Sequence, residues 1–105
     1  MNQYEVVIVN LDPTIGSKIK KTRPCVIVSP EEMNKVLNTI IIVPITSNSK
    51  KYPTRVKIQK GEIKGMVAID QIRTIDKKRV ITQLGQISRK TTLQIKEVIS
   101  EMLVE

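Results

Sequence analysis

The sequence predicts a small, mainly β domain in which short antiparallel strands form a barrel or curled sheet. Three observations lead to this fold class. Short runs of β-branched residues alternate with turn residues as far as Leu84, one short segment carries helix-start signals, and the hydrophobic period changes near the C-terminus. Since 105 residues provide one modest core, we expect a single domain over residues 1–105.

The strand predictions rest on composition and on the turns between the runs. Pro24–Val28 is almost continuously apolar and is expected to be central, whereas Arg55–Gln59 alternates and should bury one face. Pro24 can open its strand because a first position need not donate to the ladder. The expected strands are Tyr4–Leu11, Pro24–Val28, Thr39–Thr46, Arg55–Gln59, Met66–Ile69, Ile72–Ile75 and Val80–Leu84.

Two helices are expected, one short and internal and one at the C-terminus. Ser29 and Pro30 match a cap followed by a first helical position, with Glu32 three residues after the cap, and the helix should end near Leu37. Ser88 is a plausible cap for the second helix. That helix carries one apolar stripe with helical spacing, made of Ile95, Val98, Ile99, Met102 and Leu103.

The charge of the chain favours a polyanionic partner. Eighteen Lys and Arg against ten Asp and Glu give a formal net charge of +8, and the excess gathers at Lys18–Arg23, Lys50–Lys57 and Arg73–Arg79. Basic surfaces attract nucleic acids by counterion release, although a single charge run is more often a solvated face. Base stacking can contribute little, because the only aromatic residues are Tyr4 and Tyr52.

Several common kinds of site are absent from the sequence. There is no histidine, so neither a Ser-His-Asp triad nor an imidazole acid–base pair can form. Cys25 is the only cysteine and lies in an apolar run, which indicates a buried thiol. The carboxylates are scattered, so we expect no metal site and no cofactor. Without a secretory signal or an apolar run long enough to span a bilayer, the chain is expected to be cytoplasmic.

Three short segments could carry chemistry. In Thr22-Arg23-Pro24 the proline fixes the backbone and holds Arg23 at a defined angle, where a guanidinium can clamp a phosphate. Thr46 and Ser47 place two hydroxyl groups at the end of a strand, and Asp70 opens a segment of polar residues that alternates with Ile72. Each segment alone also has an ordinary structural explanation, such as a rim arginine, a strand cap or a turn.

Taken together and in this order, the segments resemble the MazF/PemK family of toxin endoribonucleases from bacterial toxin–antitoxin pairs. The resemblance covers nearly the whole chain. Its most specific stretches are Asn10–Ser17, Lys21–Pro24, Pro44–Ser47, Tyr52–Thr54 and Asp70–Asp76. It implies an SH3-like barrel, MazF/CcdB-like, that works as a homodimer. It also implies metal-independent cleavage of single-stranded RNA by the substrate's 2′-hydroxyl, leaving 2′,3′-cyclic phosphate and 5′-hydroxyl ends and inhibiting translation.

The resemblance also assigns roles to residues. Arg23 and Thr46 correspond to catalytic residues of the family, and Asp70 is the expected acceptor of the 2′-hydroxyl proton. A cognate antitoxin with an acidic, partly disordered segment should neutralise the basic groove. The residues expected to bind RNA are Lys20, Lys21, Ser47, Pro53, Thr54, Gln71 and Arg73.

One departure from the family pattern and two alternative functions remain open at this point. Tyr4 stands where the family usually has glycine, and it could either alter packing near the site or offer a base a stacking surface. CcdB-like toxins share the barrel but inhibit DNA gyrase without cutting RNA, so fold alone does not decide the activity. A plain nucleic-acid-binding module would bind in a salt-dependent way and form no product.

Overall fold

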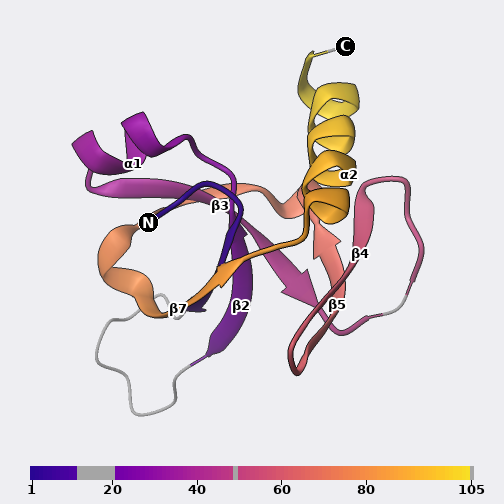
Figure 1. Ribbon diagram of the computed structural model, residues 1–105, viewed down its shortest axis with the longest axis horizontal. Coiled ribbons are helices and arrows are strands. Elements are labelled where there is room, and N and C mark those ends of the chain that lie inside the picture. The colour runs from indigo at the N-terminus through magenta and orange to yellow at the C-terminus, as the bar shows by residue number, and fades with distance from the viewer. Residues whose placement is uncertain (12–20, 49, 105) are drawn as a thin grey trace.

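Seven strands form one curled antiparallel sheet, which confirms the predicted mainly β fold (Figure 1). The computed structural model describes residues 1–11, 21–48 and 50–104. The strands lie in the order β4-β5-β3-β2-β1-β7, and β6 also pairs with β3. They are β1 (Glu5–Asn10), β2 (Thr22–Ile27), β3 (Thr39–Thr46), β4 (Arg55–Lys60), β5 (Ile63–Ala68), β6 (Arg73–Asp76) and β7 (Val80–Gln86).

Strand β3 organises the sheet because it pairs with three neighbours. On one edge, residues 42–44 pair with β2. On the other edge, residues 39–42 pair with β6, and the last two residues, Ile45 and Thr46, pair with Val67 and Met66 of β5. The C-terminal end of β3 therefore lies between the start of β2 and the β4–β5 hairpin.

The two predicted helices are α1 (Glu31–Val36) and α2 (Arg89–Ile99), and α2 continues into a π-helical turn, η3 (Ser100–Val104). The Ser88 hydroxyl accepts a hydrogen bond from the Thr91 backbone N–H at 3.2 Å, which confirms the predicted cap. Short 3₁₀ turns, η1 (Ile69–Gln71) and η2 (Lys77–Arg79), flank β6. No helix in the described ranges combines the length and the apolar character needed to span a bilayer.

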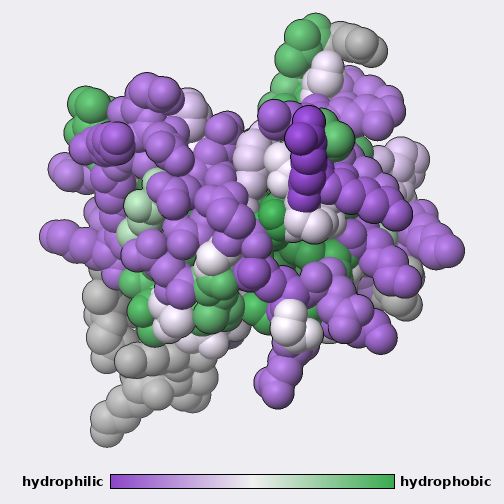
Figure 2. Space-filling model, viewed as in Figure 1, coloured by the Kyte–Doolittle hydropathy of each residue, from purple (hydrophilic) through white to green (hydrophobic). Residues whose placement is uncertain are grey.

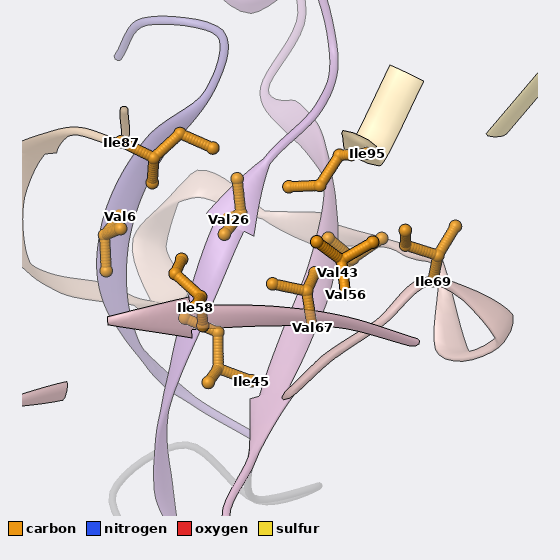
Figure 3. Packing of buried hydrophobic residues seen from close by; sticks show 10 residues of the cluster. All are labelled: Val6, Val26, Val43, Ile45, Val56, Ile58, Val67, Ile69, Ile87 and Ile95. Carbon is orange, nitrogen blue, oxygen red and sulfur yellow. The ribbon is translucent and has the colours of Figure 1, made fainter. Parts of the chain in front are cut away.

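The sheet carries an apolar cluster on each face. We call the cluster under α2 the helix-side core. Figure 3 shows its side chains converging from several strands and from Ile95 of α2. Its buried members are Val6, Val26, Val43, Ile45, Val56, Ile58, Val67, Ile69, Ile87 and Ile95. The opposite core consists of Val7, Val9, Cys25, Ile27, Ile40, Ile42 and Ile75. Because neighbouring residues of a strand face opposite sides, burial on both faces requires the continuous apolar runs seen in the sequence.

The start of α1 differs from its prediction. The Ser29 side chain makes no N-cap bond, and Pro30 occupies the cap position. The buried Ser29 hydroxyl instead accepts from the Ile41 N–H at 3.1 Å and bonds to the side-chain oxygen of Asn34. Asn34 also donates to the Ser29 carbonyl at 3.0 Å. A buried polar group needs partners, and these bonds tie α1 to β3.

Candidate functional site

A cleft opens where the start of β2, the end of β3 and the tip of the β4–β5 hairpin meet. Its volume is about 300 Å³. Arg23 and Thr46, which belong to separate motifs in the sequence, both line it, together with Ser47. The full lining is Thr22, Arg23, Pro24, Ile45, Thr46, Ser47, Glu62, Ile63 and Lys64.

The register between β2 and β3 accounts for the proximity of Arg23 and Thr46. Cys25 of β2 pairs with Pro44 of β3 in an antiparallel ladder. Two residues further along both strands, the same register puts Arg23 opposite Thr46, and opposed residues project from the same face. Strand β2 begins at Thr22, two residues before its predicted start, so Arg23 is part of the strand.

Cys25 supports this strand end and has the inert role that the sequence indicated. Its thiol donates to the Arg23 carbonyl across 3.6 Å. Burial raises the pKa of the Cys25 thiol to about 12, against a smaller opposite effect of the nearby Arg23 and Arg73 charges. A thiol that stays protonated at neutral pH is a poor nucleophile.

The Thr46 hydroxyl is oriented by the turn that follows β3. Its oxygen accepts a hydrogen bond from the Asn48 backbone N–H at 3.2 Å. Because that bond uses a lone pair, the hydroxyl proton can still be donated to an anion in the cleft. Thr46, at the end of β3, is only partly buried. A ligand in the cleft can therefore reach its side chain.

Gly65 allows β5 to approach the backbone of Thr46 unusually closely. A methyl group built on Gly65 would lie 2.2 Å from the Thr46 carbonyl oxygen and 3.4 Å from the Ile45 side chain. Since real Cβ atoms do not come that close, any larger residue would push β5 away from β3. Gly65 therefore fixes the position of Thr46 through the backbone.

The structure places Asp70 outside the cleft lining, in an ion pair with Arg55. The Arg55 Nε donates to Asp70 Oδ1 at 2.8 Å and Nη2 donates to Oδ2 at 3.2 Å, while the Thr54 hydroxyl adds a bond to Oδ1 at 3.0 Å. The hydrogen bonds from Arg55 and Thr54 hold the pKa of Asp70 below its usual range. Tyr52 stacks under the Arg55 guanidinium at 5.3 Å. This cluster anchors the end of the β3–β4 loop to η1.

The predicted RNA-binding residues fall into three groups. Ser47 lies in the cleft, and Lys21 lines an adjoining hollow with Leu11, Thr22 and Arg23. Thr54 is bonded to Asp70, and the exposed side chains of Pro53, Gln71 and Arg73 lie outside the cleft lining. Lys20 lies outside the described residues.

The contribution of the β4–β5 hairpin, namely Glu62, Ile63 and Lys64, was not predicted from the sequence. A glycine between two strand-like runs, such as Gly61, is typical of a turn, and the structure gives it a left-handed φ of 58°. That signal locates a hairpin but not its neighbour in space. The hairpin lines the cleft because β5 pairs with the end of β3, a contact between distant parts of the chain.

The structure separates Tyr4 from the cleft. Its φ of 64° lies in the left-handed region, where a residue other than glycine is strained by about 1–2 kcal/mol. Its ring packs on the helix-side core near the Lys96 ammonium, 5.6 Å away. Backbone bonds to Ile27 and Ile87 hold the residue in place. Tyr4 therefore takes part in packing and is not a member of the cleft lining.

Comparison with known proteins identifies the family of the chain. Residues 2–103 match the model of the family described as the PemK-like, MazF-like toxin of type II toxin–antitoxin systems. The chain belongs to this family. The match spans nearly all of the sequence, including every strand that contributes to the cleft.

Curated relatives include two proteins named Endoribonuclease MazF. The protein from Staphylococcus saprophyticus is 33% identical, over 94% of this chain and 88% of its own. The one from Staphylococcus epidermidis is 34% identical, over 87% of this chain and 81% of its own.

Among solved structures, MazF from Deinococcus radiodurans has a TM-score of 0.83 at 24% identity, covering 100% of this chain and 97% of that one. A mycobacterial endoribonuclease bound to its cognate antitoxin has a TM-score of 0.85 at 22% identity, over 99% and 95%. These two structural likenesses show the fold.

The first prediction concerns Gly65. Gly65→Ala should destabilise the fold by about 1–3 kcal/mol, because the added methyl forces β5 away from the Thr46 carbonyl. Urea unfolding followed by circular dichroism measures the change. Gln59→Ala, an exposed change on β4, is the control and should shift the midpoint little. An unchanged midpoint for Gly65→Ala would contradict the proposed close approach.

The second prediction concerns Asp70. Because its pKa is lowered in the folded state, its ionised form stabilises the protein at neutral pH, and this contribution disappears as the pH falls through the lowered value. Asp70→Asn should therefore lower the urea midpoint at pH 7, and its difference from wild type should shrink as the pH falls through the lowered pKa of Asp70. A midpoint difference that stays the same across this range would show that the ion pair with Arg55 does not contribute in this way.

Proposed function

We propose that this protein is an endoribonuclease toxin that cuts single-stranded RNA, thereby inhibits translation, and is neutralised by a cognate antitoxin. The observation that carries the proposal is that Arg23 and Thr46 project from neighbouring strands into one cleft. Both lie in motifs that resemble the family's catalytic motifs, and the curated relatives named above are endoribonucleases.

The proposed reaction is an internal transfer at the phosphorus atom. The 2′-oxygen forms a bond to the adjacent phosphorus, the bond to the 5′-oxygen breaks, and the products are a 2′,3′-cyclic phosphate and a 5′-hydroxyl. Charge builds on the nonbridging oxygens, where the Arg23 guanidinium stabilises it with fixed positive charge and two N–H donors. The Thr46 hydroxyl donates to the same phosphate. No metal ion takes part in this scheme.

The 2′-hydroxyl proton needs an acceptor, and among the described residues that line the cleft Glu62 is the one carboxylate. We propose Glu62 for this role in place of Asp70, whose carboxylate is bonded to Arg55 and Thr54. The leaving 5′-oxygen takes its proton from water, because a guanidinium holds its proton too firmly at neutral pH to act as a good acid. The described residues hold no group of three His, Cys, Asp or Glu side chains suited to a metal ion.

The surroundings of the cleft suit a single-stranded RNA. Lys21 and Ser47 border Arg23 and Thr46 and would contact phosphates, while the exposed Gln71 and Arg73 offer donors to base edges or phosphates. Lys20, Pro53 and Thr54 remain candidates from the motif match alone.

The proposal includes a homodimer and an acidic antitoxin segment. Apolar side chains are exposed at the tips of α1 and of the C-terminal helix (Figure 2), with Val36 81% and Val104 77% exposed. A second copy of the chain would cover such surface. The net charge of +8 suits an acidic partner, and the related mycobacterial endoribonuclease was solved with its cognate antitoxin.

The third prediction tests the activity itself. Purified protein should cut unstructured RNA in excess EDTA, and the fragments should carry 2′,3′-cyclic phosphate and 5′-hydroxyl ends. End sequencing with and without phosphatase and kinase treatment identifies the ends and the cut sequence together. Cleavage that stops in EDTA, or fragments with 5′-phosphates, would overturn the proposed chemistry. Absence of any cleavage would overturn the proposed activity.

The fourth prediction concerns the cleft residues. Arg23→Lys keeps the charge but loses the forked donor, and Thr46→Val keeps the shape but loses the hydroxyl. Each should lower kcat by about a hundredfold or more. Glu62→Gln should lower kcat, whereas Asp70→Asn should retain it. Arg89→Lys, an exposed change at the start of α2, serves as control. Near-normal kcat for Arg23→Lys and Thr46→Val would remove both from the reaction.

A further inference from the structure

The cleft continues along the outer face of the β4–β5 hairpin. Thr46 pairs with Met66 of β5, and Met66 pairs in turn with Lys57 of β4. Opposed residues project from the same face of a sheet, so these three side chains form a row across three strands. Neighbouring strands lie about 4.8 Å apart, so the backbone of Lys57 lies about 10 Å from the backbone of Thr46.

A second hollow adjoins this row. Its volume is about 350 Å³, and it is lined by Ser47, Lys57, Lys64, Gly65 and Met66. Ser47 and Lys64 also line the cleft of Arg23 and Thr46. Because the two hollows share these residues, they adjoin, and we refer to them together as the groove. Met66, half-buried, provides an apolar floor between the two lysines.

The two lysines are available to bind an anion. Both are exposed, and neither forms an ion pair within 4.0 Å with any residue in the described ranges. The only such pair there joins Arg55 to Asp70. Glu97 of α2 and Glu101 of η3 line another hollow, which Lys57 also borders, and Glu62 lines the cleft together with Lys64. None of these carboxylates is among the residues that line the hollow of Lys57, Lys64 and Met66.

We propose that this part of the groove, which we call the hairpin subsite, holds a nucleotide that adjoins the one cut in the cleft. Lys57 and Lys64 bind its phosphate, and Met66 contacts its ribose or base. The inference rests on the proposed function in one respect, namely that the neighbouring nucleotide is cut in the cleft. Binding of RNA at the hairpin subsite does not itself require cleavage. Met66 would give a base an apolar contact in a subsite whose lining contains no aromatic residue among those described.

The test measures binding and cleavage separately. The binding probe is a short fluorescent RNA of mixed sequence, 2′-O-methylated throughout so that no 2′-hydroxyl can attack. Its affinity is measured by fluorescence anisotropy at several salt concentrations for Lys57→Gln, Lys64→Gln and the wild type. Each lysine variant should bind several-fold more weakly, and the slope of log affinity against log salt should fall by about 0.7 for each phosphate that the variant no longer neutralises.

Lys35→Gln is the matched control, because it removes the same charge from α1, at the other end of the molecule from the β4–β5 hairpin (Figure 1). It should leave the salt slope at the wild-type value. Equal slopes for the hairpin variants and the wild type would overturn the inference, as would an equal loss in Lys35→Gln, since that would report net charge alone.

Cleavage then localises the contact. With the cut sequence known from end mapping, RNAs are shortened on one side of the cut at a time. Lys57→Gln and Lys64→Gln should raise KM severalfold with kcat unchanged on the full-length RNA, and this effect should vanish on RNA shortened on one of the two sides. An effect that persists on both shortened RNAs would overturn the hairpin subsite. A wild-type protein that binds the probe but cuts no RNA would refute the proposed function while leaving the binding result intact.

Discussion

The pairing register at the end of β3 is the constraint on which the proposed site depends. Arg23 and Thr46 lie more than twenty residues apart in the sequence, and they share a cleft because β2 and β3 pair with Cys25 opposite Pro44. A shift by one residue would turn every side chain of one strand to the other face. Both strands bury apolar side chains on both faces, so the fit of individual side chains in the two cores, rather than an alternation of apolar and polar residues, opposes that shift.

The other edge of β3 adds a second constraint. Gly65 lets the β5 backbone approach the Thr46 carbonyl, so the hairpin that carries Glu62 and Lys64 is fixed against the same strand end as the threonine. Three segments that are separate in the sequence thereby become one surface with a rigid backbone. Such rigidity suits a reaction in which the protein contributes oriented donors and charge, since those groups need no rearrangement as the transition state forms.

Much of the fold could be predicted from the sequence because its signals are local. Apolar runs and turn residues located every strand, and the Ser88 cap and the apolar stripe located α2. Non-local contacts could not be predicted in this way. No local pattern indicated that Asp70 would pair with Arg55, that Ser29 would bond to Ile41 rather than cap α1, or that the β4–β5 hairpin would border the cleft. In each case the deciding partner lies in another strand or loop.

The chemistry that we propose uses neither imidazole nor a metal ion, and this bears on the charges around the cleft. A site of that kind must supply its own positive charge to offset a phosphodiester, and arginine does so at every physiological pH. Carboxylates near such a site would cancel that charge unless they were paired elsewhere, and Asp70 is held by Arg55 and Thr54 away from Arg23. Glu62 differs from Asp70 because it lines the cleft, from the tip of the β4–β5 hairpin, and it is the carboxylate that we propose as proton acceptor.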